Sequence, residues 1–415
     1  MTLITILFFA HQPERLLPYD KRRNSRPTPQ KLRSHFFDDT LNRDIFNKVA
    51  EKCYYPATRM LLEMAESQAD RKKPFRFSFA LSGTFIEQAR RYAPDLLDIH
   101  RRLAATGLVE YTAETHYHSL SSLFDSEKRD FQEQVSLHCE TIEQLTGRRP
   151  TFFRNTECLY NNGIAATVQK MGFEGILTEG VDWLMQGWRS PDFVYQSVTG
   201  LPVLLRNYRL SDDIGYRFSN RSWEGWPLRA ETFVGWLAGN TDMNVTLALD
   251  YEALGEHMWA DTGIFDFLRQ LPYEVERHYQ LEFTTPTEAV RRLPSMGTVD
   301  VSDYTTISWA DQERDTSAWL RNEMQQFCFE ELKLLEPLIR ETEDSYFLEC
   351  WRLMQTSDHY YYLSDKAMSD GDVHQYFSAY GSLVESFIRL HTALTDLRVA
   401  AERHIEKKRA GQLPE

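Results

Sequence analysis

Two acidic side chains stand at the ends of two apolar, strand-like segments. Glu157 closes the segment 151–157, and Asp250 closes the segment 245–250. A run of β-branched and aromatic residues that leads directly into a carboxylate is typical of a buried parallel strand whose tip enters a pocket. Two such carboxylates facing each other across one cleft are the usual equipment for cleaving a glycosidic bond. For either acid taken alone, a charged residue that simply ends a strand is the plainer interpretation.

The elements that would position these acids alternate along the first three quarters of the chain. Strand-like runs are predicted at 3–9, 75–81, 108–113, 151–155, 174–178, 202–206 and 245–250, with a further candidate at 281–284. Amphipathic segments between them include 44–67, 85–105, 127–146 and 161–171. Such alternation predicts parallel strands joined by crossover helices, in either a barrel or an open sheet.

The character of the chain changes after about residue 310. Strand signals stop, and helical patterns follow at 314–341, 344–368 and 372–408. We therefore expect residues 1–305 to form a catalytic barrel and residues 306–415 to form a C-terminal helical domain that contributes to the active-site cleft.

Polar side chains follow more than half of the predicted strands. The residues at these strand ends are His11, Glu114, His116, Glu157, Asp250 and Glu252. In a β/α barrel, the side chains that perform chemistry project from the carboxyl ends of the strands. The pattern therefore indicates an active site, although sequence alone does not show which acid plays which role.

Two short motifs carry further polar groups. His11 and Gln12 could bind sugar hydroxyls, and Pro13 would end the strand before them, but a structural histidine is the alternative for His11. In the segment 250–257, Glu252 and Glu256 would share one helix face, and His257 adds a potential metal ligand. A metal site built from His11, Asp250 or His257 stays an alternative. The sequence does not, however, contain the H-x-x-x-H or H-E-x-x-H spacing of known zinc motifs.

Aromatic residues offer candidate platforms for a sugar. In the C-terminal region, Trp351, Asp358 and His359 precede or adjoin the run Tyr360-Tyr361-Tyr362, a combination suited to stacking on a sugar and binding its hydroxyls. Four further tryptophans are candidates, although each alone is more typical of core packing: Trp188, Trp223, Trp226 and Trp309.

Composition excludes several classes of partner. The 415 residues carry a net charge of −14, which argues against nucleic acid or an anionic membrane as partner. The five cysteines are scattered without a C-x-x-C pair, which favours reduced core residues in a cytoplasmic protein. The apolar start of the chain lacks a basic region and is more typical of a first strand than of a signal peptide, and no run is long enough for a membrane helix.

Taken together, these segments resemble glycoside hydrolase family 57, in particular its α-amylase-type branch. The matching stretches are 11–13, 113–120, 153–157, 187–191, 206–213, 250–257, 308–311 and 355–361. They occur in order and span nearly the whole chain. One departure is at Phe9, because many members read H-x-H-Q-P in the first motif and this chain has Phe in place of the leading His.

The resemblance implies a (β/α)7 barrel, a distorted TIM-like fold, followed by a helical region. It implies retaining hydrolysis of α-1,4-glucans without a metal or organic cofactor. Glu157 matches the position of the nucleophile, and Asp250 matches that of the general acid/base. The resemblance also implies that the subsite around the scissile bond is lined by His11, Glu114, His116, Asp358 and His359.

The leading hypothesis is a cytoplasmic retaining hydrolase of starch, glycogen or maltooligosaccharides. A 4-α-glucanotransferase on the same scaffold is the alternative, followed by a catalytically silent glucan-binding protein and a metal-dependent hydrolase or deacetylase. The candidate substrate-binding residues are His11, Gln12, Glu114, His116, Trp188, Glu252, His257, Trp309, Trp351, Asp358 and His359. Chain-length preference and oligomeric state leave no signal in the sequence.

Overall fold

A computed structural model describes residues 1–22, 26–69, 71–240 and 242–412. Contacts divide the chain into two compact units. The first unit comprises Met1–Gln12, Ile45–His116 and Arg129–Trp309, and the second comprises Pro13–Asp44, Tyr117–Lys128 and Ala310–Glu415. The domain boundary expected between residues 305 and 306, and the helical domain's contribution to the cleft, stay predictions.

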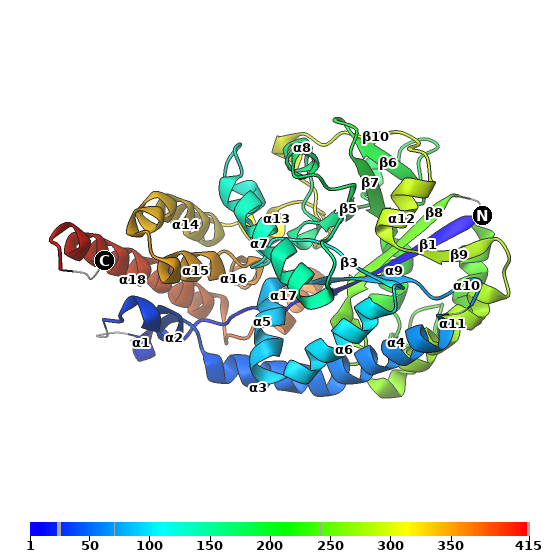
Figure 1. The fold of residues 1–415 in the computed structure, drawn as a ribbon, viewed down its shortest axis with the longest axis horizontal. Helices are drawn as coiled ribbons and strands as arrows, with labels where there is room; N and C mark the ends of the chain where they lie inside the picture. Colours follow the sequence, from blue (N-terminus) through cyan, green and yellow to red (C-terminus); the bar gives the residue numbers. More distant parts are fainter. Residues whose placement is uncertain (23–25, 70, 241, 413–415) are drawn as a thin grey trace. The chain divides into compact units, whose positions relative to one another are not determined.

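The first unit is built around a ring of parallel strands (Figure 1). In the described part of the chain, the ring contains β1 (Thr2–Ala10), β2 (Phe77–Leu81), β3 (Val109–Tyr111), β4 (Phe152–Arg154), β5 (Gly175–Glu179), β7 (Pro202–Arg206) and β8 (Asn244–Asp250). Strand β1 pairs with β2 and β8, and β5 pairs with β4 and β7. Two brief contacts nearly close the ring, a parallel bridge between Ala113 and Phe153 and the single pair Arg206–Thr246. The predicted distorted (β/α)7 barrel is confirmed.

Three further strands extend this sheet. β9 (Leu281–Thr284) pairs with the first half of β1, as the candidate run at 281–284 predicted. The strands β6 (Val194–Ser197), antiparallel to β7, and β10 (Thr298–Val299), beside β6, were not predicted. Four and two residues are too few to show a clear strand period.

Helices join the strands of the first unit. The helices are α4 (Tyr55–Gln68), α5 (Gly83–Tyr92), α6 (Pro94–Ala105), α7 (Arg129–Thr146), α8 (Asn162–Lys170), α9 (Tyr208–Gly215), α10 (Ala230–Gly239), α11 (Ile264–Glu276) and α12 (Pro286–Arg292). The π-helix η2 (Ala50–Tyr54) lies between α3 (Asp39–Val49) and α4. The amphipathic segment predicted at 85–105 is two helices, because Pro94 ends the hydrogen-bond pattern of α5 and begins α6.

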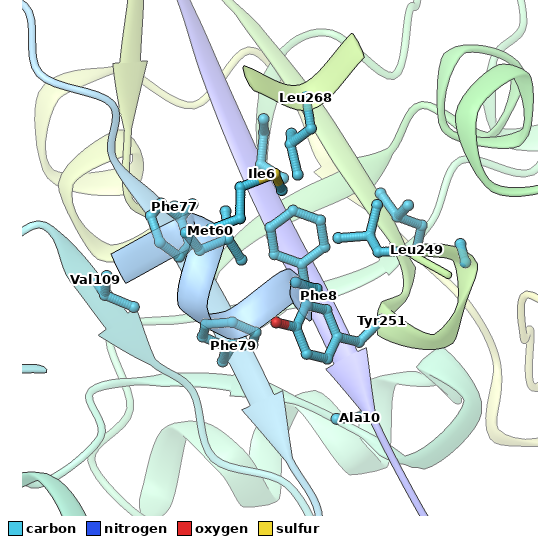
Figure 2. Packing of buried hydrophobic residues seen from close by; sticks show 14 of the residues in the cluster. Ile6, Phe8, Ala10, Met60, Phe77, Phe79, Val109, Leu249, Tyr251 and Leu268 are labelled. Atoms are coloured by element: carbon cyan, nitrogen blue, oxygen red, sulfur yellow. The ribbon is translucent and has the colours of Figure 1, made fainter. Parts of the chain in front are cut away.

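Strand β1 separates two apolar clusters. Its side chains alternate, so one face contributes to a large core shared with α4, α5, α6, α10 and α11, and the other faces the inside of the ring. The first set is Ile4, Ile6, Phe8 and Ala10, and the second is Leu3, Leu7 and Phe9. Figure 2 shows Phe8 beside both Phe79 and Tyr251, with ring centroids 5.7 and 5.6 Å away. Phe9 is thereby directed into the ring.

The second unit is helical, and the predicted C-terminal helical region is confirmed within it. Its helices are α1 (Tyr19–Arg22), α2 (Leu32–Phe36), α13 (Ser317–Leu320), α14 (Glu323–Thr342), α15 (Ser345–Leu353), α16 (Ser357–Tyr361), α17 (Met368–Phe377) and α18 (Leu383–Arg409). The pattern at 344–368 is interrupted after α15, where the Thr356 hydroxyl bonds the carbonyls of Tyr117 and Leu353. The pattern at 372–408 is interrupted before Ser382, whose side chain caps α18. Among the helices that the structure describes, none has the length and apolar content required to cross a bilayer.

Candidate active site

Glu157 lies in a tight turn directly after β4. The turn η4 (Thr156–Cys158) holds both Glu157 and Cys158 at φ 54°. This left-handed region is unfavourable for residues with a β-carbon, at a cost of roughly 1–3 kcal/mol each. Backbone strain of this kind persists only where the surroundings enforce it, and it concentrates at functional positions. The turn points to a constrained role for the Glu157 carboxylate.

Trp309 fixes both the side chain and the backbone of Glu157. Its indole Nε1–H donates a hydrogen bond of 2.7 Å to Glu157 Oε2, and its backbone N–H donates one of 3.2 Å to the Glu157 carbonyl. A hydrogen bond to an ionised carboxylate is stronger than one between neutral groups. Trp309 therefore holds the carboxylate in one orientation.

Arg154 supplies positive charge beside Glu157. The guanidinium is buried and donates a 3.0 Å hydrogen bond to Glu114. Burial lowers the pKa of Arg154, but negatively charged neighbours, including Glu114 and Glu157, raise it by more, so that it lies above its ordinary value. A neighbouring cation favours the ionised form of a carboxyl group.

A second buried arginine, Arg206, also lies close to Trp309. Arg206, the last residue of β7, bonds Glu179 at 3.0 Å and Asp212 at 2.5 Å. The guanidinium carbons of Arg206 and Arg154 each lie 5.4 Å from the Trp309 ring centroid, within cation–π range. Sequence reasoning missed Glu179 and Arg206, although each ends a barrel strand, the same signal that singled out Asp250.

Phe9 occupies the position where many family members have histidine. It is 3% exposed, and the Arg154 guanidinium lies 4.0 Å from its ring centroid. Its ring packs edge-on against Trp309 at 5.0 Å, and its backbone is in register with Asp250 of β8. Phe9 thus gives this edge an apolar surface that carries no hydrogen bond, and it links the surroundings of Glu157 to Asp250.

Asp250 and Glu252 stand at the carboxyl end of β8. Asp250 is its last residue, and Glu252 lies in the turn η6 (Tyr251–Ala253). Glu252 Oε1 accepts a 2.6 Å hydrogen bond from Tyr54, whose oxygen accepts one of 2.9 Å from Gln12 Nε2. Burial, and secondly the charge of Asp250, raise the pKa of Glu252 to about 8. The two carboxyls are thus electrostatically coupled.

His11, predicted at the tip of β1, belongs to the same group. Its backbone N–H is a hydrogen-bond donor to Glu252, and its Nδ1 lies 2.8 Å from the Ser82 hydroxyl. Ser82 also caps α5 by accepting from the Phe85 N–H. The His11 imidazole is therefore oriented by Ser82, which is itself held in place as the N-cap of α5.

The residues after β3 are held in place by buried partners. The Glu114 backbone N–H donates to His138 Nδ1 at 3.2 Å, so the His138 proton resides on Nε2, which donates to the Leu81 carbonyl at 2.7 Å. His116 packs directly on Gly83, where a β-carbon would lie 2.4 Å from its ring. Its Nε2 lies 3.4 Å from Glu87. Close approach of α5 to His116 therefore requires glycine at position 83.

The remaining predicted residues have varied surroundings. Trp188 is 61% exposed in the segment after η5 (Asp182–Leu184), and burial lowers the pKa of His257 to about 4, which keeps its imidazole neutral at pH 7. In the second unit, Trp351 is fully buried and donates to the Leu332 carbonyl, which is the environment of a packing residue. Asp358 accepts from Tyr362 at 3.3 Å, and His359 is buried. Substrate roles for these residues stay predictions.

The described residues also include one group with metal-ligand spacing, formed by Asp311, Glu313 and Asp370 in the second unit. Lys366 lies within it, 2.7 Å from Asp311 and 2.8 Å from Glu313. The ammonium already neutralises these carboxylates, so the group is accounted for as an ion-pair network.

Comparison with known families decides the affiliation of the chain. The profile of Glycosyl hydrolase family 57 matches residues 5–302. The chain belongs to this family. It is therefore a glycoside hydrolase by family, with the (β/α)7 barrel and the strand-end acids described above.

Proteins similar to this chain carry names of different activities. A protein of Methanocaldococcus jannaschii named "Putative alpha-amylase" is 41% identical over 402 residues, which cover 95% of this chain and 84% of the relative. The 4-α-glucanotransferase of Thermococcus litoralis has a TM-score of 0.67 at 13% identity, and the match covers 97% of this chain and 60% of that one. A family 57 branching enzyme of Thermococcus kodakaraensis has a TM-score of 0.67 at 12% identity, over 100% of this chain and 92% of that one. At such low identity the two structures show the shared fold.

For this family 57 protein, replacing Trp309 by Phe is expected to lower kcat by about tenfold to a hundredfold. The variant keeps an aromatic ring near Arg154 and Arg206 but loses the indole N–H that donates to Glu157. A hydrogen bond to a charged group contributes about 1.5–3 kcal/mol, and about 1.4 kcal/mol corresponds to a tenfold change in rate. Steady-state kinetics on a maltooligosaccharide would measure the effect.

The matched control is Trp183→Phe, at a tryptophan of the same unit that is 49% exposed. Its kcat should equal that of the parent enzyme. Equal rates for all three proteins would show that the indole N–H does not support Glu157.

Proposed function

We propose that the protein hydrolyses α-1,4-glucosidic bonds of starch, glycogen or maltooligosaccharides with retention of configuration. Glu157 is the nucleophile, and Asp250 is the general acid and then the general base. The observation that carries this assignment is the environment of Glu157, whose carboxylate is held by the Trp309 indole N–H beside the buried Arg154 cation.

The reaction proceeds in two displacements. The Glu157 carboxylate attacks the anomeric carbon while Asp250 protonates the departing glycosidic oxygen, which gives a covalent glycosyl-enzyme. Asp250 then removes a proton from water, and the oxygen of that water displaces Glu157 and restores both side chains. Each displacement inverts the anomeric carbon, so the product keeps the configuration of the substrate.

The remaining side chains of the first unit have supporting roles in this proposal. His11, Gln12, Glu114 and His116 are held by hydrogen bonds near the strand ends and bind or orient the sugar at the cleavage site. Aromatic Trp188 offers an exposed platform on which a more distant glucose ring can stack. The reduced state of Cys53, Cys139, Cys158, Cys328 and Cys350, all free and buried, supports a cytoplasmic location.

Product analysis tests the activity directly. The protein is incubated with maltoheptaose in the presence of a chelator, and the products are separated by chromatography. We expect shorter maltooligosaccharides as products. The newly formed reducing end should have the α configuration, which NMR spectra recorded at early times would show. The name of the 41% identical relative favours this hydrolytic outcome.

Other outcomes would each identify an alternative. Formation of longer as well as shorter chains would indicate glucanotransferase activity, in which a sugar hydroxyl replaces water as acceptor. Binding of maltoheptaose without turnover would indicate a silent glucan-binding protein. Activity that disappears only with the chelator would contradict the metal-free mechanism.

A further inference from the structure

The two strands that meet at Arg206 share very little backbone pairing. In the described part of the chain, β7 and β8 are joined in register by the single pair Arg206–Thr246, and the Asn207 N–H donates to the Thr246 carbonyl at 2.9 Å. On its other side, β8 pairs with β1 from Asn244 to Asp250. Among the described residues, the edge of β8 that faces β7 therefore has no regular ladder along the segment that leads to Asp250.

Side chains take the place of that ladder next to Asp250. The Arg206 Nε–H donates to the Ala248 carbonyl at 2.7 Å, and the Ala248 N–H donates to the Ser211 hydroxyl of α9 at 3.1 Å. Both backbone groups of Ala248, two residues before Asp250, are thus bonded by buried side chains of β7 and α9. Because a buried backbone group requires a partner, these bonds fix the path of β8 toward its carboxyl end.

The other nitrogens and the face of the Arg206 guanidinium are also in contact with neighbours. Nη1 donates to Glu179, the last residue of β5, at 3.0 Å, and Nη2 donates to Asp212 of α9 at 2.5 Å. The Trp309 ring centroid lies 5.4 Å from the guanidinium carbon. Burial lowers the pKa of Arg206, but the charges of Glu179 and Asp212 raise it by more, so the group stays charged. A planar guanidinium can hold several acceptors in one fixed geometry.

We propose that Arg206 is a positioning residue that sets the separation of the Glu157 and Asp250 carboxyls. It acts on Asp250 through the backbone of β8. It acts on Glu157 through Trp309, whose indole N–H donates to that carboxylate at 2.7 Å. The inference rests on the proposed catalytic roles of both acids. In retaining catalysis the two carboxyl groups must lie about 5–5.5 Å apart, so a residue that connects their supports affects the rate.

Replacing Arg206 by Lys tests this role and keeps a positive charge beside Glu179. An ammonium is a point charge without the planar fork that holds Ala248, Glu179 and Asp212 together, and it has no flat face for Trp309. We expect kcat for the consumption of maltoheptaose to fall by about tenfold to a hundredfold, because a misplacement of about 1 Å can cost a hundredfold in rate. KM should change by less than about twofold, since the substrate contacts remain.

The matched control is Arg217→Lys. Arg217 also bonds a carboxylate, that of Asp213, at 2.7 Å, and its guanidinium carbon lies 5.7 Å from the Trp223 ring centroid. It follows α9 and lies outside the proposed machinery, so its kcat and KM should equal those of the parent. An Arg206→Lys variant with the parent kcat, or with a loss confined to KM, would overturn the inference.

Double-mutant cycles separate positioning from a general structural loss. In Trp309→Phe the indole N–H that holds Glu157 is absent, and in Asp250→Asn the acid is absent, so one of the two connections no longer ends on a catalytic group. The factor by which Arg206→Lys lowers kcat should therefore be smaller by at least about twofold in each of these backgrounds than in the parent. An equal factor in all three backgrounds would contradict the inference.

A milder variant decides the question if Arg206→Lys does not fold. Asp212→Ala removes the partly exposed acceptor of Nη2 and leaves the buried pair of Arg206 and Glu179 intact. We expect its kcat to fall by roughly twofold to fivefold with KM unchanged, in keeping with the contribution of a partly exposed ion pair. The parent kcat in a folded Asp212→Ala variant would then overturn the inference.

Crystal structures of the parent and of Arg206→Lys separate this inference from the proposed function. The distance between the Glu157 and Asp250 carboxyls should differ between the two proteins by about 1 Å, the displacement that such a rate loss requires. An unchanged distance would overturn the inference, whatever the activity. An inactive parent whose variant shows the changed distance would instead refute the catalytic assignment alone.

Discussion

Replacing Glu157 by Gln should reduce kcat on maltoheptaose by at least roughly 10⁴-fold, as expected for loss of a catalytic nucleophile. The amide has nearly the same shape, and its carbonyl oxygen can still accept from the Trp309 indole N–H. The amide lacks the negative charge that attacks the anomeric carbon in the proposed mechanism. Fold and glucan affinity should therefore persist, which thermal unfolding and equilibrium binding would verify.

Azide can distinguish a nucleophile from a residue that merely binds substrate. In Glu157→Ala, azide fits the space of the missing carboxylate and should attack α-maltosyl fluoride to give the β-glycosyl azide. Restoration of activity with an inverted product assigns the nucleophile. If Glu157→Gln retains the parent rate, Glu157 is not the attacking group.

Replacing Asp250 by Asn should lower kcat on maltoheptaose by about 10²–10⁴-fold, which is the usual contribution of general acid–base catalysis. The loss has two parts, because in the proposed mechanism Asp250 protonates the departing sugar and later activates water. With α-maltosyl fluoride the first part is small, so glycosyl-enzyme should accumulate. Mass spectrometry of the quenched reaction would detect it, with the adduct on the peptide that contains Glu157.

Azide again provides the decisive comparison. In Asp250→Ala it should attack the accumulated glycosyl-enzyme and release an α-glycosyl azide, the opposite anomer to that from Glu157→Ala. The same anomer from both variants would contradict the division of roles between the two carboxyls.

The architecture is predictable because its signals are local and repeated. Strands β1 and β8 are apolar runs of nine and seven residues, and polar residues stand at or directly after the carboxyl end of each. The alternation of such runs with amphipathic segments is enough to predict a barrel or an open sheet from the sequence alone. The two-residue β10 has no comparable signal, and it is defined by its pairing with β6.

The partners within the site are less predictable, because they come from distant segments. The sequence of the segment that forms the π-helix η2 carries no signal that Tyr54 bonds Glu252, which lies 198 positions away. Strand alternation leaves the direction of Arg154 open, whereas the structure stacks it on Phe9 and pairs it with Glu114. The replacement of histidine by Phe9 is visible in the sequence, but its consequence depends on three-dimensional neighbours.

The position of Trp309 bears on where the C-terminal boundary of the catalytic domain should be drawn. The family match stops at residue 302, and the expected barrel stops at residue 305, yet the indole that holds Glu157 comes afterwards. Trp309 is the last residue of the first compact unit. The boundary of the family match therefore leaves out the residue that holds Glu157, and fragments of this protein intended for activity should extend past that tryptophan.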